Sequence, residues 1–142
     1  LHDVGQLWLI RFLPHDFKSA WTQALAHAQG IEEAEQQAFG VNHAVIGGWL
    51  ASHWALPSVI SSAIRNHHVC EDALEHRLVP VIHVAEVLSN ALDLAAREEN
   101  RVTHLSTPAC RMLGLTWDGS SQSLFGKIAA RSRHANIFFG AA

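Results

Sequence analysis

Two consecutive helical segments of this chain each place a histidine on the face that should be buried. The first follows Asn42, a good N-cap, and His43 lies on its apolar stripe. The second begins at Pro57, and its stripe ends at His67, which is followed by His68. A histidine beside a core is often only hydrogen-bonded, so a structural role is the first interpretation. A metal site is the second.

Further donor groups favour the metal site. The chain starts with His2-Asp3, and His83 and Glu86 lie about one helical turn apart in VIHVAEVL. Imidazole and carboxylate ligands that converge from several helices suit a divalent transition metal such as iron, manganese, zinc or nickel. Purely oxygen ligands would instead indicate magnesium or calcium. The sequence indicates no other cofactor.

Composition restricts the class of protein. The chain has 142 residues, of which 49% are hydrophobic and 16% charged, enough for one domain with a core. Its net charge of −3 gives no electrostatic footprint for nucleic acid, and no apolar run reaches the length of a membrane span or resembles a signal peptide. Cys70 and Cys110 form no dense framework, which fits a reducing compartment. We therefore expect a cytoplasmic protein that binds neither nucleic acid nor membranes.

The apolar pattern predicts an all-α fold of about six to seven helices. Eight segments with a helical pattern, one or two more than this number, begin near residues 1, 16, 31, 42, 57, 78, 108 and 118. Asp16 is the expected cap of the second segment, and Asp118 or Ser120 that of the last. Residues 69–77 read as a loop at the mouth of the site, and 98–105 as a charged linker.

The periodicity also predicts which side chains face the core. The expected inward residues are Val4, Leu7, Trp8 and Phe12; Phe17, Trp21, Ala24 and Ala28; Ile46, Gly47, Leu50 and Trp54; Ile60, Ala63 and Ile64; Ile82, Ala85, Leu88 and Leu92; and Leu124, Ile128 and Ala129. The residues expected to face water are Glu32, Glu33, Glu35, His83, Asn90 and Asp93. Val41 and Ile46 should close a hydrophobic staple.

Several motifs carry a family resemblance. LHDVGQLWL resembles the LHDIGKL signature of the HD phosphohydrolase superfamily. The stretch FGVNHAVIGGWLASHWALPSVISSAIRNHH, followed by LVPVIHVAEVLSNAL, resembles the HDOD branch, the HD-related output domains of bacterial signalling proteins. The likeness covers residues 1 to about 93, and PACRMLGLTWDG is similar to the C-terminal end of such domains. It implies an HD-like helical bundle over 1–142, with a core of 1–97 and C-terminal helices in 98–142.

The resemblance also assigns site residues. It implies metal ligands at His2, Asp3, His43, His67 and His68, with Glu86 where the last aspartate of the superfamily would lie. Glu35, in E-x-x-x-F-G, and His83 belong to the same pocket. Three departures matter: Gln6 replaces the usual lysine, the first superfamily histidine would precede Leu1, and VCEDAL lacks the glycine-tyrosine-proline run of enzymes that cleave cyclic di-GMP.

Two functions follow from these residues. The first is a non-catalytic signalling module that passes its output to other signalling domains or proteins. The second is a metal-dependent phosphohydrolase, in which a cation would polarise a phosphoryl oxygen and generate a hydroxide nucleophile. We favour the first and assign no catalytic residue, because one ligand is absent, one is altered and Gln6 cannot supply positive charge.

The start of the chain predicts an assembly. Its first helix lacks a cap, and in the family a larger helical portion precedes the HD dipeptide, so we expect the N-terminal helices of the domain to be missing. Trp8, Leu9 and Phe12 would then form an apolar patch on that helix. We expect self-association or a requirement for another segment.

Overall fold

The computed structural model describes residues 1–69, 76–94, 104–119 and 121–138. Over these residues the chain is all-helical and contains eight helices, so the predicted class is confirmed with slightly more helices than the expected six to seven. The predicted mouth residues Glu71, Asp72 and Glu75, the linker up to residue 103 and the alternative cap Ser120 lie outside the described residues. No helix in the described ranges is long and apolar enough to cross a bilayer.

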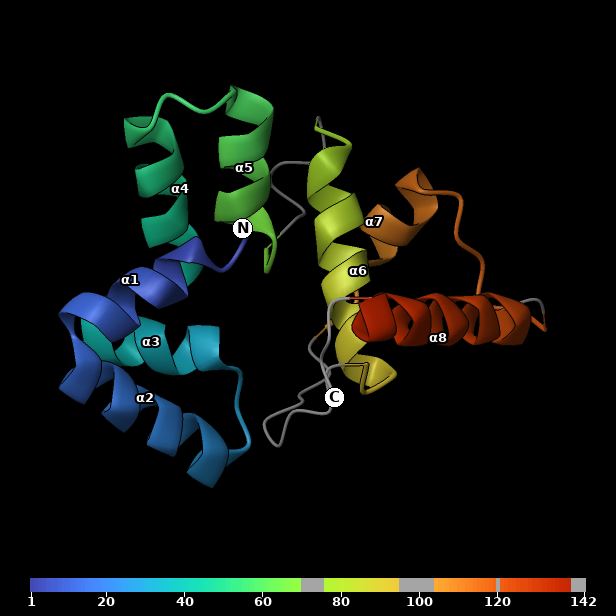
Figure 1. Cartoon of the computed structure of the whole chain (residues 1–142). Coiled ribbons are helices and arrows are strands. Elements are labelled where there is room, and N and C mark those ends of the chain that lie inside the picture. The colour runs from blue at the N-terminus through green and yellow to red at the C-terminus, as the bar shows by residue number, and fades with distance from the viewer. Residues whose placement is uncertain (70–75, 95–103, 120, 139–142) are drawn as a thin grey trace.

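Figure 1 shows the helices packed in a series. Their bounds are α1 Val4–Phe12, α2 Pro14–His27, α3 Ile31–Phe39, α4 His43–His53, α5 Ser58–Asn66, α6 Leu78–Ala91, α7 Thr107–Met112 and α8 Ser121–Phe138. Helix α1 packs on α2 and α4, α2 packs on α3, and α4 packs on α5, which leads through α6 to α7. The contact between α5 and α6 links helices α1–α5 to helices α6 and α7.

Local sequence signals set several helix ends. The Asn42 side chain accepts a hydrogen bond from the Val45 N–H at 3.1 Å, as its predicted role as N-cap requires. Gly40, with φ 71°, ends α3 in the left-handed conformation that glycine tolerates. The predicted cap Asp16 is wrong, because α2 already begins at Pro14. Proline suits that first position, since its missing N–H would be unpaired there anyway.

Two of the three apolar clusters among the described residues pack against the helices that carry the histidines. Leu9, Phe17 and Ile46 form one, with Val41 packed against it as the predicted staple requires. The other joins α5, α6 and α7 through buried residues, which are Ala63, Val79, Val84, Ala109 and Cys110. The helices that carry the histidines therefore each pack against an apolar cluster, α4 against the first and α5 against the second.

Several predicted faces are wrong. Trp54 is 50% exposed at the end of α4, and Leu7 and Phe12 are exposed on α1 while Leu9 is fully buried. Helix α6 is rotated from the expected face, since Ala85 is exposed. Its buried residues are Val79, Pro80, His83, Val84 and Val87.

The remaining corrections concern Ala28 and helix α8. Ala28 is exposed because it is the left-handed C-cap of α2. Leu124, Ile128 and Ala129 are half-buried, and no residue of α8 with a described side chain is fully buried. Periodicity predicts a single inward stripe, whereas α1 and α6 each meet two neighbouring helices.

Glycines let α1, α4 and α5 approach closely. A Cβ on Gly5 would overlap the carbonyl oxygen of His43 and lie 2.8 Å from the Gly47 backbone nitrogen. A Cβ on Gly47 would in turn lie 2.8 Å from the Ile64 side chain of α5. The residues just before α1 are therefore held beside the start of α4, which positions Asp3 next to His43.

Candidate metal centre

The structure brings together donor side chains from four parts of the chain. They form two groups, His43, His67 and His68 on the one hand and His2, Asp3 and Glu86 on the other, and the donor atoms of each group lie within 4.8 Å of one another. His2 and Asp3 precede α1, His43 starts α4, His67 and His68 follow α5, and Glu86 lies in α6. These are all six predicted metal ligands, and we call them the donor cluster.

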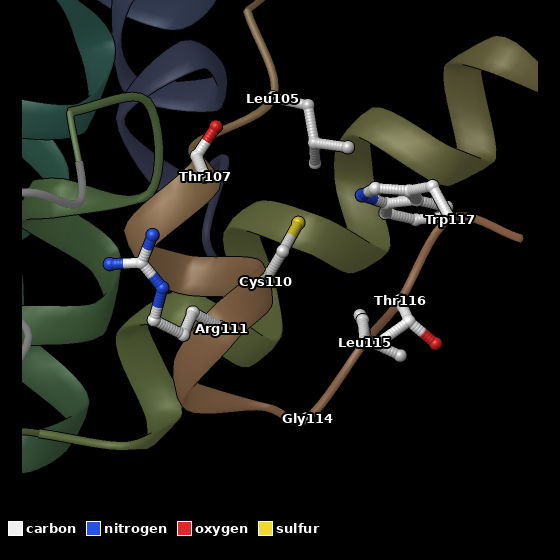
Figure 2. Close-up of a pocket in the computed structure, with 8 residues that line it drawn as sticks. All are labelled: Leu105, Thr107, Cys110, Arg111, Gly114, Leu115, Thr116 and Trp117. Atoms are coloured by element: carbon white, nitrogen blue, oxygen red, sulfur yellow. The ribbon is translucent and has the colours of Figure 1, made fainter.

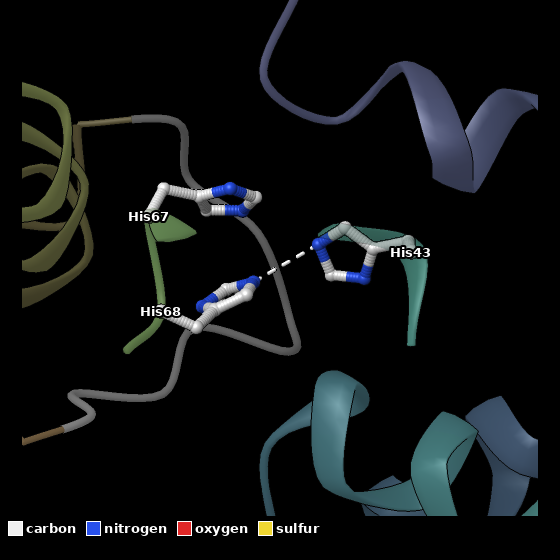
Figure 3. Close-up of side chains that lie close together, drawn as sticks. All are labelled: His43, His67 and His68. Carbon is white, nitrogen blue, oxygen red and sulfur yellow. Dashed lines mark hydrogen bonds between the residues drawn. The ribbon is translucent and has the colours of Figure 1, made fainter. Parts of the chain in front are cut away.

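Short distances link the two groups. His43 Nε2 lies 2.9 Å from His68 Nε2, and Figure 3 shows these rings facing each other beside His67. Asp3 Oδ1 lies 3.6 Å from the Nε2 atoms of both His43 and His67. The Glu86 carboxylate lies 3.9 Å from His67 Nε2 and 3.9 Å from His68 Nδ1. Asp3 and Glu86 thus connect the histidines to the more exposed side of the cluster.

Glu35 orients the His43 ring from the side opposite the donor cluster. Its Oε2 accepts the His43 backbone N–H at 2.7 Å and lies 2.6 Å from His43 Nδ1. An ionised carboxylate only accepts, so Nδ1 carries a proton and Nε2 faces the cluster. Burial disfavours a charged imidazole, but the hydrogen bond and charge of Glu35 outweigh it and raise the pKa of His43. Glu35 is fully buried, which corrects the expectation that it faces water.

His67 presents an unsatisfied nitrogen to the cluster. Its Nδ1 lies 2.7 Å from the Ile64 carbonyl oxygen and donates to it, which leaves Nε2 as the acceptor. Nε2 is buried and has no hydrogen-bond partner among the described residues. Burial lowers the pKa of His67 to about 4, so its imidazole is neutral at neutral pH.

The second paired histidine is also held neutral. Burial, together with the neighbouring His67 and His43 rings, lowers the pKa of His68 to about 2. His43 Nε2 and His68 Nε2 therefore share one proton at 2.9 Å, and the pKa shifts assign that proton to His43. His68 then accepts from His43 through the nitrogen lone pair that a metal ion would use.

The carboxylates lie on the exposed side of the cluster. The side chains of His2 and Asp3 are each 36% exposed, and His2 Nε2 lies 3.1 Å from Asp3 Oδ2. Burial alone would raise the pKa of Asp3, but His2 and the other histidines lower it to about 2. The same hydrogen bond raises the pKa of His2. Burial and the negative charge of Asp3 raise the pKa of Glu86 to about 7.

These donors fit a divalent transition metal. Adjacent ligands at about 2.0–2.1 Å from one ion lie about 2.8–3.0 Å apart in an octahedral arrangement and about 3.3–3.4 Å apart in a tetrahedral one. The spacings in the cluster run from 2.9 to 3.9 Å, so only small side-chain movements are needed. The ligand atoms are imidazole nitrogen and carboxylate oxygen, and the buried Nε2 of His67 lacks any other described partner.

Comparison with known proteins places this geometry in a family. The family model of the HDOD domain matches residues 1–70. This first half of the chain is consistent with an HDOD domain. No curated protein and no solved structure matches the chain. The HDOD match includes every donor of the cluster except Glu86, which α6 supplies from outside it.

The other residues that the sequence placed near the donor cluster differ in burial and hydrogen bonding. His83 was expected to face water, but it is only 3% exposed and hydrogen-bonded through both ring nitrogens, so it is not placed as a ligand. Gln6 is half-buried in α1. Glu32 is half-buried as well, and burial raises its pKa, which the acidic pattern of α3 had not indicated. Arg65 is exposed, and the carboxylates expected to pair with it lie outside the described residues.

Proposed function

We propose that this chain is a cytoplasmic HDOD signalling module whose donor cluster binds a divalent transition metal, and which acts through protein contacts rather than by catalysis. The observation that carries the metal assignment is His67 Nε2, a buried acceptor without a described hydrogen-bond partner. Leaving such a group unsatisfied costs about 1–3 kcal/mol, so a ligand for it is expected. Iron, manganese, zinc and nickel all suit the donors.

The surroundings of His67 support this assignment. Glu35 and the Ile64 carbonyl each fix one imidazole so that its Nε2 faces the cluster. Such partners raise the basicity of a ligand and hold its orientation. Burial and the negative charge of Asp3 raise the pKa of Glu86, and a bound cation would neutralise both carboxylates.

The donor count argues against catalysis. If both groups of three donors bound one ion, all six of its positions would be filled, whereas catalytic sites keep a position open for water or substrate. Phosphoryl chemistry also requires positive groups where negative charge develops. Here Gln6 stands in the position of the lysine in the resembling signature, and carboxylates line the exposed side. The output then passes to other signalling domains or proteins.

One observation favours the alternative, a metal-dependent phosphohydrolase. The pKa of Glu86 is about 7, and a partly exposed carboxyl with such a pKa can exchange protons at neutral pH. A bound cation would supply Lewis acidity toward a phosphoryl oxygen. In this alternative Glu86 would be the general acid or base rather than a ligand.

Metal analysis and a turnover assay separate the two functions. We expect the purified protein to bind Co²⁺ as a spectroscopic probe, with binding lost in His67→Ala but kept in His53→Ala, a matched change at an exposed histidine of α4. We expect no turnover of bis(p-nitrophenyl) phosphate with Mn²⁺ or Ni²⁺. Wild type that binds no Co²⁺ would refute the metal site. Turnover that disappears in both His67→Ala and Glu86→Gln would establish the enzyme instead.

A further inference from the structure

His83 lies outside the donor cluster but contacts the backbone of one of its members. Its Nδ1 donates to the His67 carbonyl oxygen at 2.7 Å, and its Nε2 accepts the Ser106 backbone N–H at 3.1 Å. His67 and Ser106 are fully buried, and His83 is 3% exposed. Since both ring nitrogens are used, the bonds fix the neutral tautomer with its proton on Nδ1. Neither nitrogen is left for a metal ion.

The two backbone groups that His83 contacts, in His67 and Ser106, each have a structural role. The carbonyl of His67 belongs to the peptide group between His67 and His68, so holding it fixes the direction of both imidazoles. Ser106 is the N-cap of α7, and its Oγ accepts the Ala109 N–H at 3.2 Å. A continuous set of buried hydrogen bonds therefore runs from the start of α7 through α6 to the paired histidines.

We propose that His83 is a positioning residue for metal binding, which holds the peptide between His67 and His68 in place and couples metal binding to the start of α7. The inference rests on the proposed metal site. The HDOD match ends at residue 70, so this connection ties the matched segment to helices beyond it. A buried network of this kind is rigid only while all of its members are satisfied.

Helix α7 also offers a built-in reporter. Figure 2 shows Cys110 of α7 beside a cavity of about 340 Å³ that Leu105, Leu115 and Trp117 also line. Cys110 is a free thiol with 4% exposure, so its reaction with a maleimide requires α7 to open. In a Cys70→Ser background, the labelling rate of Cys110 reports on α7. We expect Co²⁺ to slow this labelling severalfold.

A pair of Ser106 variants tests the connection without substituting His83. Ser106→Ala removes the hydroxyl cap but keeps the backbone N–H, whereas Ser106→Pro removes both. The φ of Ser106 is −64°, which proline can adopt. The proline ring also places its Cδ where the N–H pointed toward His83, so Ser106→Pro both removes this bond and displaces the His83 ring. We expect Ser106→Ala to bind Co²⁺ as wild type does, and Ser106→Pro to bind about tenfold more weakly, as for other groups that orient ligands.

His83 itself is tested by three substitutions. His83→Leu should weaken Co²⁺ binding about tenfold or more and abolish the effect of Co²⁺ on Cys110 labelling. His83→Gln, which keeps one donor and one acceptor, should restore part of the affinity. His53→Leu, the same change at an exposed histidine, should have no effect.

The outcomes separate this inference from the metal proposal. In protein without added metal, His83→Leu and Ser106→Pro should shift the imidazole NMR signals of His67 and His68, and Ser106→Ala should not. This holds even if wild type binds no Co²⁺, a result that would refute only the metal site and the coupling. Co²⁺ affinity within twofold of wild type in both His83→Leu and Ser106→Pro, with unshifted His67 and His68 signals, would overturn the positioning role.

Discussion

The residues of the donor cluster differ in which proton must leave before a metal can bind. His67 and His68, with pKa values of about 4 and about 2, are already neutral at pH 7, and Asp3, with a pKa of about 2, is already ionised. His43 and Glu86 still carry protons near neutral pH, because Glu35 raises the pKa of His43 while burial and Asp3 raise that of Glu86 to about 7. Protons therefore compete with metal mainly at these two side chains and at His2, whose pKa the hydrogen bond to Asp3 raises.

This assignment predicts the pH dependence of metal binding. As pH falls through about 7, Glu86 gains a proton in the free protein, so Co²⁺ affinity should decrease. With unperturbed histidine ligands alone, this loss would instead lie near pH 6.5, at about the ordinary histidine pKa. Titration calorimetry between pH 5.5 and 8.5, in buffers of different ionisation enthalpy, measures the protons released.

Glu86→Gln is the matched variant for this prediction. It should bind Co²⁺ more weakly above pH 7 but with a shallower pH dependence, because the proton that Glu86 loses near pH 7 is then absent. A wild-type profile that stays flat from pH 6 to 8, or one that Glu86→Gln leaves unchanged, would contradict the assignment.

At the scale of elements, the crossing of α1 and α4 decides whether the cluster can form. Asp3 reaches His43 because Gly5 lets the two backbones touch at the first turn of α4. Any side chain at position 5 would meet backbone atoms, which cannot rotate away as a flexible side chain can.

Gly5→Ala should therefore damage both stability and metal binding. The added methyl group would push α1 away from α4, at a cost of about 1–3 kcal/mol in the free energy of unfolding. Because Asp3 moves with α1, Co²⁺ affinity should also fall. Urea denaturation followed by circular dichroism, together with a Co²⁺ titration, measures the two effects.

Gly126→Ala provides the control for this change. Gly126 lies in α8 with no described atom within 4 Å of the position a Cβ would take. Alanine is there expected to stabilise the helix by about 0.5–1 kcal/mol and to leave Co²⁺ binding unchanged. Equal stability of Gly5→Ala and wild type would show that the helices can separate without cost.

At the scale of the whole molecule, apolar side chains gather on the outer side of α1. Leu7 is 67% exposed, Ile10 46% and Phe12 58%, and Leu1 just before the helix is 73% exposed. The sequence predicted a patch on this helix from Trp8, Leu9 and Phe12, but Leu9 is in the core. The patch is therefore present with different members.

We expect this patch to cause self-association at micromolar concentration, because apolar clusters of this kind are usually covered by another surface. Light scattering after gel filtration should give a mass above that of the 15.6 kDa chain. Leu7→Asp combined with Ile10→Asp should restore a monomer, whereas Leu25→Asp, at an exposed position of α2, should not. A stable wild-type monomer that binds no hydrophobic dye would contradict this prediction.

Much of the fold could be predicted from the local sequence. The all-α class follows from periodicity, and the N-cap role of Asn42 follows from short-range hydrogen bonding that the sequence encodes directly. The candidate ligands were also identified from residue type and motif, because imidazole and carboxylate groups suit such an ion. These features depend on neighbours in the chain, which is why they were predictable.

Which polar side chains are buried depended on how the helices cross. Glu35 and His83 read as solvated polar residues in the sequence, yet Glu35 orients His43 and His83 joins His67 to Ser106. Both roles arise from contacts between different helical elements, and helical periodicity does not specify crossing angles or partners. The sequence by itself determined the helices and the chemical types of the donors, whereas the tertiary structure decided which donors meet, because Gly5 and Gly47 set the distances between their helices.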